Sequence, residues 1–169
     1  MKNIALIGFM GSGKTTLAGI LAANLHFSLR EIDEDVVRHS PYSSVTEIFD
    51  KKGEEYFREL EQAIIADAVK KDQQVISCGG GVVLFDEVMK LLKNNAVIVF
   101  LHADFKTITQ RLKDTSSRPL FRDMEKAMAL YAKRIPLYEK YADIKIETDA
   151  QTPEQVAEKI ITGLKRYEQ

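Results

Sequence analysis

The chain has 169 residues, of which 45% are hydrophobic and 29% charged, and its formal net charge is −1. This length and balance are typical of one soluble globular domain with a full core. The near-neutral charge argues against the basic face that DNA or RNA binding normally requires, although local basic clusters can still bind small anions. We therefore expect no nucleic-acid partner.

One cysteine and one short N-terminal apolar run bear on where the protein resides. Cys78 has no second cysteine with which to form an internal disulfide, which favours a reducing compartment. The apolar run at residues 4–7 is far too short for a secretion signal or a membrane span. We expect a cytoplasmic protein with no membrane partner, and we expect it to be a monomer.

Short apolar runs alternate with longer amphipathic stretches along the chain. The sequence predicts strands at residues 4–7, just before Asp33, and at 75–78, 96–101 and 144–146. The first helix is predicted at 14–25. Continuous apolar runs, each followed by a helix, indicate a parallel sheet covered on both faces. The expected fold class is α/β, with a parallel five-stranded sheet flanked by helices in a single domain, residues 1–169.

Several predicted helices carry explicit start signals. Ser44 and Glu47 have the spacing of a capping box, and so do Thr152 and Gln155. Apolar residues at alternating spacings of four and three predict a helix over 123–141, whose apolar face comprises Met124, Met128, Tyr131, Ile135 and Tyr138.

Three further features refine this picture. Pro136 predicts a kink within the helix at 123–141. Asp104, just beyond a predicted strand, is interpreted as a helix cap. The helical pair predicted at 44–71 is an insertion between strands and is too long for a simple crossover. We interpret residues 33–71 as a substrate-binding subdomain within the single domain.

Residues 8–15 fit the P-loop pattern G-x-x-x-x-G-K-[ST], with a predicted strand before them and a helix after. Glycines let backbone N–H groups turn inward around phosphates, and the helix N-terminus adds a favourable dipole. Lys14 is expected to bridge the β- and γ-phosphates, and the Thr15 hydroxyl to ligate Mg²⁺. The expected nucleotide-binding residues here are Gly11, Ser12, Gly13, Lys14, Thr15 and Thr16. The alternative is a glycine-rich turn with a surface lysine.

A P-loop alone does not identify the acceptor, because kinases, GTPases and mechanical ATPases all use one. The Asn-Lys-x-Asp motif with which GTPases read guanine does not occur in the sequence. Motor ATPases are generally much longer. These observations favour a small kinase that uses ATP and Mg²⁺.

The remaining clusters, in their order and spacing, resemble the shikimate kinase family over almost the whole chain, from Ile4 to about Leu164. Besides the P-loop at 8–16, the matching stretches are DED at 33–35, FRELE at 57–61, GGG at 79–81, RPL at 118–120 and RIPLY at 134–138. The resemblance implies a three-layer P-loop kinase fold with a helical substrate-binding insertion and a lid, here at residues 113–123. It also implies phosphorylation of shikimate by ATP to shikimate 3-phosphate, in aromatic amino acid (chorismate) biosynthesis.

Asp33 and Asp35 stand two residues apart at the end of a predicted strand, where ligands bind in open α/β sheets. Alternate residues of an extended segment point to the same side, so both carboxylates are expected to face one cleft. The resemblance implies that Asp33 helps to hold Mg²⁺, and that Asp35 contacts the shikimate hydroxyls and accepts a proton late in the transfer. The alternative is a solvated acidic turn that caps the next helix.

Arg58 and Glu61 are three residues apart on a predicted helix, a spacing that also suits an ordinary surface pair. The resemblance implies that Arg58, with Arg134, binds the shikimate carboxylate, and that Glu61 holds the Arg58 guanidinium in place. An apolar floor under the substrate ring would be formed by Val45, Phe49 and Phe57, whose alternative role is ordinary helix packing.

The run of Gly79, Gly80 and Gly81 is difficult to explain as a plain loop, because each glycine raises the entropic cost of folding. Close approach of backbone to a ligand explains it better. The resemblance implies that this loop donates backbone N–H groups to the substrate. The run also stands where many P-loop proteins carry a second acidic metal motif, so Asp33 would supply the carboxylate near the metal.

The segment 113–123 has little periodicity and looks like the family's lid, from which Arg118 would reach the transferring phosphate and neutralise developing charge. Arg111, with Gln151 and Pro153, resembles the family's adenine clamp, while a solvated helix end is the alternative for Arg111. The residues expected to be catalytic are therefore Lys14, Asp35 and Arg118.

One stretch departs from the family. Residues 39–42 are His-Ser-Pro-Tyr, at a place where the family commonly has a glycine turn. Pro41 can form a turn of another type. This difference affects the expected orientation of the substrate-binding subdomain. Metal-ligand spacing is not found at His26, His39 or His102. Cys78 is expected to be a buried small apolar residue.

Two other functions compete with this interpretation. A kinase of another small hydroxy acid, such as gluconate, would share the P-loop and the size but would not require Arg58, the glycine run and Arg134 together. A non-catalytic nucleotide-binding regulator would bind ATP without turnover that depends on an acceptor.

Overall fold

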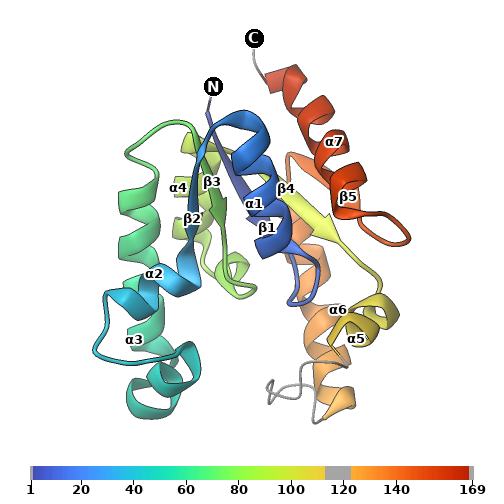
Figure 1. Cartoon of the computed structure of the whole chain (residues 1–169). Coiled ribbons are helices and arrows are strands. Elements are labelled where there is room, and N and C mark those ends of the chain that lie inside the picture. Colours follow the sequence, from blue (N-terminus) through green and yellow to red (C-terminus); the bar gives the residue numbers. More distant parts are fainter. Residues whose placement is uncertain (1, 113–122, 168–169) are drawn as a thin grey trace.

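Five parallel strands form one sheet in the computed structural model, which describes residues 2–112 and 123–167 (Figure 1). The strands are β1 (Asn3–Ile7), β2 (Ser28–Glu31), β3 (Gln74–Ser77), β4 (Ala96–His102) and β5 (Ile144–Glu147). They lie in the order β2-β3-β1-β4-β5, which makes the first strand of the chain the central one. All neighbouring pairs are parallel, so the predicted parallel five-stranded sheet is confirmed.

Helices cover both faces of this sheet. Their bounds are α1 (Lys14–Leu25), α2 (Ile32–Arg38), α3 (Val45–Ala68), α4 (Asp86–Asn95), α5 (Phe105–Leu112), α6 (Met124–Tyr141) and α7 (Pro153–Leu164), with short 3₁₀ turns η1 (Val82–Leu84) and η3 (Lys165–Tyr167). The helices α1 and α7 pack on one face, and α3, α4 and α6 pack on the other (Figure 1). The three-layer architecture is therefore confirmed.

The central strand supplies both halves of the core. Ile4 and Leu6 pack with α1 and α7, whereas Ala5 and Ile7 pack with the helices of the opposite face. Successive strand residues point to opposite faces, so a strand covered on both sides needs apolar residues at every position. All four side chains are fully buried, and burial of each Ile or Leu stabilises the fold by roughly 1.5–3 kcal/mol.

The predicted helical pair at 44–71 is α3, which is broken in its middle. The Ser44 hydroxyl caps the helix by accepting from the Glu47 N–H at 3.1 Å. The Glu47 carboxylate accepts from Ser43 instead, so the predicted capping box is only half formed. Gly53 interrupts the helix with φ 81° and ψ 176°, a conformation that is essentially restricted to glycine. The two halves of α3 therefore leave Gly53 in different directions.

The helix predicted at 123–141 is α6, which continues past Pro136. Its predicted apolar face is wrong at the start of the helix, because Met124 and Met128 are 46% and 55% exposed. The buried stripe instead contains Ala127 and Tyr138. A helical period predicts which residues share a face, but it does not predict where along the helix that face is covered.

The other helix signals are confirmed. Thr152 and Gln155 form a complete capping box at the start of α7. Asp104 precedes α5, and its carbonyl oxygen accepts from the Ile108 N–H at 3.0 Å, as expected of a residue at a helix N-terminus. Within residues 2–112 and 123–167, no helix is long and apolar enough to span a membrane.

Candidate active site

The P-loop joins β1 to α1 at the carboxyl edge of the sheet. Gly8, Gly11 and Gly13 have φ angles of 152°, 79° and 96°, which glycine adopts at little cost. A Cβ on Gly8 would also lie 2.6 Å from the Leu101 carbonyl oxygen. The Lys14 amine folds back over the loop and donates to the carbonyl oxygens of Gly8 and Phe9 at 2.8 and 3.0 Å.

A cleft of about 760 Å³ opens beside the P-loop. Such a volume suits a small-molecule site. The cleft brings together predicted residues that are distant in sequence, among them Gly11, Gly13, Lys14, Thr15, Thr16, Asp33, Arg58, Gly79, Gly80, Gly81 and Arg134. The predicted apolar floor also lines it, and the rings of Phe49 and Phe57 lie 4.9 Å apart.

The glycine run leaves room for charged side chains. A Cβ on Gly79 would lie 2.8 Å from Asp33 Oδ1 and 2.9 Å from Glu61 Oε1. A Cβ on Gly81 would lie only 2.1 Å from Arg58 Nη2. These contacts are closer than real Cβ atoms make, so the absent side chains create the space that the carboxylates and the guanidinium occupy.

Arg58 and Glu61 form a buried pair, which excludes the alternative of an ordinary surface pair. Arg58 Nη1 donates to Glu61 Oε2 at 2.7 Å, and the two side chains are 12% and 2% exposed. Burial raises the pKa of Glu61, and the Arg58 charge opposes that shift. Arg58 also pairs with Glu54 at 3.2 Å. The guanidinium is therefore held from two sides at the wall of the cleft.

Arg134 enters the cleft from α6 and approaches the same glycine run. Its Nη1 would lie 3.5 Å from a Cβ on Gly80, and its buried Nε has no hydrogen-bond partner among the described residues. Tyr138 donates to the Gly80 carbonyl oxygen at 2.6 Å. Burial raises the pKa of Tyr138 to about 12, so its hydroxyl remains a donor at neutral pH. The helical period predicts only that Tyr138 packs on the apolar face of α6, and nothing in that period indicates its hydrogen bond to the glycine run.

The expected geometry of Asp33 and Asp35 is wrong. Both lie in the first turn of α2 rather than on an extended segment, so their side chains diverge by about 200° around the helix axis. Asp33 lines the cleft and Asp35 does not. The buried Asp35 carboxylate pairs with Arg30 at 2.7 Å and with Arg38 at 2.9 Å. Its predicted contact with the substrate stays a prediction, and it would require Asp35 to give up one of these two arginines.

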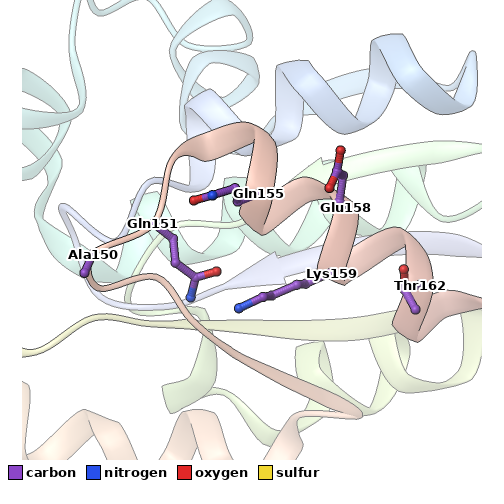
Figure 2. A pocket seen from close by; sticks show the side chains of 6 residues that line it. All are labelled: Ala150, Gln151, Gln155, Glu158, Lys159 and Thr162. Atoms are coloured by element: carbon purple, nitrogen blue, oxygen red, sulfur yellow. The ribbon is translucent and has the colours of Figure 1, made fainter.

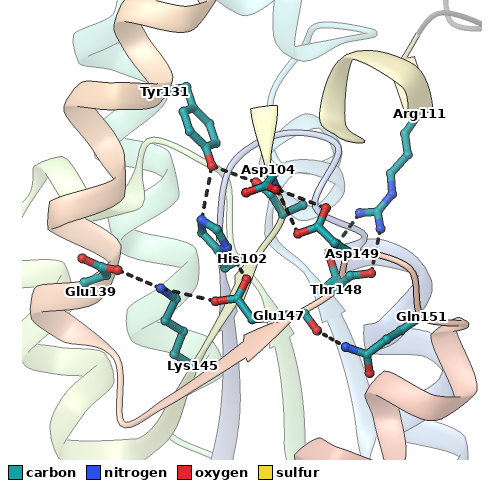
Figure 3. Close-up of polar contacts among 11 residues, drawn as sticks. His102, Asp104, Arg111, Tyr131, Glu139, Lys145, Glu147, Thr148, Asp149 and Gln151 are labelled. Carbon is teal, nitrogen blue, oxygen red and sulfur yellow. Dashed lines mark hydrogen bonds and ion pairs between the residues drawn. The ribbon is translucent and has the colours of Figure 1, made fainter. Parts of the chain in front are cut away.

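The predicted adenine clamp lies on the other side of the P-loop. Arg111 donates to the Gly11 carbonyl oxygen at 3.2 Å and to the Thr148 hydroxyl and carbonyl at 3.2 and 3.1 Å (Figure 3). Arg111 is therefore not a simple solvated helix end, because it ties the P-loop to the segment that follows β5. Pro153 begins α7 in the same region.

Gln151 faces a separate hollow. Its Nε2 donates to the Glu147 carbonyl oxygen at 2.6 Å. Figure 2 shows it beside Ala150 and residues of α7 that line a shallow space of about 550 Å³. Neither Gln151 nor Pro153 lines the main cleft. A place for Gln151 at the adenine therefore stays a prediction, as does the role of Arg118, which lies outside the described residues together with the rest of the predicted lid up to residue 122.

The structure also gathers residues that sequence spacing did not. His102, Glu147 and Asp149 each bring one potential metal-ligand atom within 4.8 Å of the others (Figure 3). These groups already have protein partners. The His102 ring contacts the Glu147 carboxylate, which also pairs with Lys145, and Asp149 accepts from the Asp104 N–H. We interpret this cluster as a structural network at the ends of β4 and β5.

Glu31 is a second residue that the sequence did not single out. It ends β2 and lines the cleft near Thr15. Burial raises its pKa, and the neighbouring carboxylates of Glu34 and Asp33 add to the shift, whereas the hydroxyls of Ser77 and Thr15 oppose it. Nothing in the strand pattern distinguishes such a carboxylate from one on a solvated strand end.

The fold and the cleft together define a kinase of the P-loop class that acts on a small anionic acceptor. Phosphates fit the P-loop, and two arginines converge on the neighbouring space. A family model described as shikimate kinase matches residues 10–165. The chain belongs to the shikimate kinase family.

Individual relatives agree with this assignment. The shikimate kinase of Thermodesulfovibrio yellowstonii is 48% identical over 99% of this chain and 96% of that protein. That of Caldicellulosiruptor bescii is 45% identical over 96% and 95%. The structure of shikimate kinase from Acinetobacter baumannii in complex with shikimate has a TM-score of 0.91 and 29% identity, covering 99% and 95% of the two chains. A gluconokinase from Sinorhizobium meliloti, with 17% identity and a TM-score of 0.68, shares the fold alone.

Proposed function

We propose that the chain transfers the γ-phosphoryl group of ATP to a hydroxyl of shikimate, giving ADP and shikimate 3-phosphate in aromatic amino acid biosynthesis. One observation carries the proposal: Arg58 and Arg134 converge on the glycine run beside the P-loop. A planar guanidinium matches a carboxylate bidentately. Two such groups in one small cleft therefore suit an acceptor that carries both a carboxylate and hydroxyls.

The P-loop side of the cleft receives the nucleotide. Backbone N–H groups of Gly11, Ser12 and Gly13 cradle its phosphates, and Lys14 exchanges the loop carbonyls for the β- and γ-phosphates. The bonds of Arg111 to Gly11 and Thr148 support a role for its guanidinium beside the adenine. Arg118 then neutralises charge that develops on the transferring group, so Arg118→Ala should lower kcat more than it raises the shikimate KM.

The oxygen atoms on this edge of the cleft fit Mg²⁺, which prefers oxygen ligands. Thr15 and Asp33 line the cleft together, and a buried oxygen of neighbouring Glu31 has no hydrogen-bond partner among the described residues. Thr15 and Asp33 would hold the ion. When bound, the ion supplies neutralisation of the phosphate charge.

The acceptor side positions the nucleophile. Arg58 and Arg134 hold the carboxylate of shikimate, Glu61 keeps Arg58 in place, and N–H groups of the glycine run meet the ring substituents. The attacking hydroxyl oxygen forms a bond to the γ-phosphorus while the bond from that phosphorus to the β–γ bridging oxygen breaks. Asp35 takes the hydroxyl proton, for which its carboxylate has to exchange Arg30 or Arg38 for the substrate.

The organisation of the chain fits this reaction. We take residues 1–169 as one kinase domain, with 33–71 as the substrate-binding subdomain and 113–123 as the lid. A monomer and a cytoplasmic location stay predictions. Size-exclusion chromatography with light scattering tests the first, and fractionation of the source cells tests the second.

The decisive test is acceptor specificity in a coupled assay of ADP release. Shikimate should stimulate release strongly, whereas gluconate and nucleoside monophosphates should stimulate it weakly. Equal stimulation by gluconate would contradict the assignment of the acceptor. ATP binding with no stimulation by any hydroxy acid would instead indicate a nucleotide-binding regulator.

A further inference from the structure

Glu31 is a cleft carboxylate to which the proposed reaction gives no role. It is the last residue of β2 and is in register with Ser77 of β3. Its side chain therefore stands at the carboxyl edge of the sheet, where it lines the cleft with Thr15 and Asp33.

The two oxygens of the Glu31 carboxylate are unequally satisfied. Oε2 accepts from the Thr15 hydroxyl at 3.5 Å, a long contact with the same hydroxyl that a P-loop offers to a metal ion. Oε1 is buried and makes no hydrogen bond of normal geometry among the described residues, although the Ser77 hydroxyl is near enough to the carboxylate to lower its pKa. Leaving a buried acceptor without a partner costs free energy. The arrangement is therefore more stable when a donor or a cation meets Oε1.

The charges around Glu31 favour a cation. None of the described lysines, arginines or histidines is within ion-pair distance of it, and the charged neighbours that act on it are Glu34 and Asp33. Like charges this close repel one another, and a cation between them relieves that repulsion. Glu34 is in a different position, because it is exposed and pairs with Arg38 at 3.3 Å. Glu31 is thus a half-buried carboxylate of this edge, with one fully buried oxygen and no cation paired with it among the described residues.

We propose that Glu31 supplies a carboxylate oxygen to the divalent cation that accompanies the nucleotide, beside Thr15 and Asp33. This inference rests on the proposed function, which puts a metal–nucleotide complex in this cleft. A hydroxyl and two carboxylates are a donor set that suits Mg²⁺ or Mn²⁺. Glu31 then makes nucleotide binding depend on metal in two ways, because it holds the cation when one is present and repels the phosphates when none is.

The test measures ADP affinity of the full chain by isothermal titration calorimetry, once with Mg²⁺ and once with EDTA. Glu31→Gln keeps the size of the side chain and an acceptor for Thr15, but it removes the charge. With Mg²⁺, the variant should bind ADP about tenfold or more weakly, on the scale of losing a group that supports a metal. With EDTA, it should bind ADP as tightly as the parent or more tightly, because a charge near the phosphates is gone.

Glu34→Gln is the matched control, since it removes one negative charge from the same edge of the cleft. Its ADP affinity with Mg²⁺ should stay within about twofold of the parent, because Glu34 is exposed and screened. Electron paramagnetic resonance of Mn²⁺ with the ADP-bound protein gives a second readout. There, Glu31→Gln should release Mn²⁺ at concentrations that the parent and Glu34→Gln retain.

The possible outcomes separate the alternatives. If Glu31→Gln loses ADP affinity equally with Mg²⁺ and with EDTA, Glu31 only supports the fold. If Glu34→Gln loses as much ADP affinity with Mg²⁺ as Glu31→Gln does, only the total negative charge at this edge of the cleft matters. Either result overturns the proposal. A parent that binds no ADP refutes the proposed function as well. If the parent binds ADP and phosphorylates shikimate, and Glu31→Gln binds ADP with Mg²⁺ as tightly as the parent, the role of Glu31 is refuted while the proposed function stands.

Discussion

Replacing Gly81 by alanine tests whether the glycine run exists to make room for Arg58. The backbone of Gly81, at φ −89° and ψ −2°, is open to other residues, so alanine adds little backbone strain. The new Cβ would lie 2.1 Å from Arg58 Nη2 and 2.8 Å from Cζ. Both separations are far inside van der Waals contact, so the guanidinium has to move.

The expected loss follows from what holds Arg58. It donates to Glu61 at 2.7 Å, pairs with Glu54, and lies 5.0 and 5.3 Å from the ring centroids of Phe57 and Phe85. A displaced guanidinium no longer meets the substrate carboxylate, and a hydrogen bond to a charged group contributes about 1.5–3 kcal/mol. Shikimate affinity should therefore fall by about 10- to 150-fold. ATP affinity should not change, because the P-loop is untouched.

The assay compares the KM values of both substrates by coupled ADP release. Gly19→Ala is a matched control, because Gly19 lies within α1 and a Cβ there meets nothing within 4 Å. That variant should keep the parental shikimate KM and gain about 0.5–1 kcal/mol of stability. An unchanged shikimate KM in Gly81→Ala, or an equal rise for both substrates, would refute the reasoning.

Three other variants or treatments test the remaining assignments. Arg58→Lys should weaken shikimate binding by about 1–3 kcal/mol while ATP binding stays the same, and calorimetry that finds parental affinity would contradict the bidentate contact. Asp35→Asn should lower turnover about 10²-fold, and it should also lower the unfolding temperature because Arg30 and Arg38 lose their charged partner; near-normal turnover would assign Asp35 to structure alone. Burial raises the pKa of Cys78, so the thiol stays protonated near neutral pH. Iodoacetamide at pH 8 should modify it only after unfolding, and mass spectrometry that shows equally fast labelling of the folded protein would contradict this.

The sheet was predictable because its inner strands contain continuous apolar runs. Ile4 to Ile7 and the run at 96–101 face helices on both sides, so no alternation was needed to recognise them. The P-loop was predictable because its glycines and lysine have fixed spacing. The exposure of Met124 and Met128 was not predictable, because they continue the helical period of α6 beyond the part of the helix that other described elements cover.

The site was less predictable where local structure changes at a strand end. The spacing of Asp33 and Asp35 predicts an extension of the preceding strand, although three acidic residues in succession also favour the first turn of a helix. That helix turns Asp35 toward Arg30, a pairing that spacing alone does not reveal. Glu31 gave no signal because its significance depends on Thr15, which is distant in sequence but adjacent in space.

The break at Gly53 has a consequence for the choice of acceptor. Val45 and Phe49 of the apolar floor stand before it, and Phe57 and Arg58 stand after it, so its backbone dihedral angles set how far Val45 and Phe49 lie from the guanidinium. Any side chain at this position would cost about 1–3 kcal/mol of strain or straighten the helix. A change of the backbone at this one position is therefore expected to alter the width of the cleft even when Arg58 and Arg134 themselves are kept.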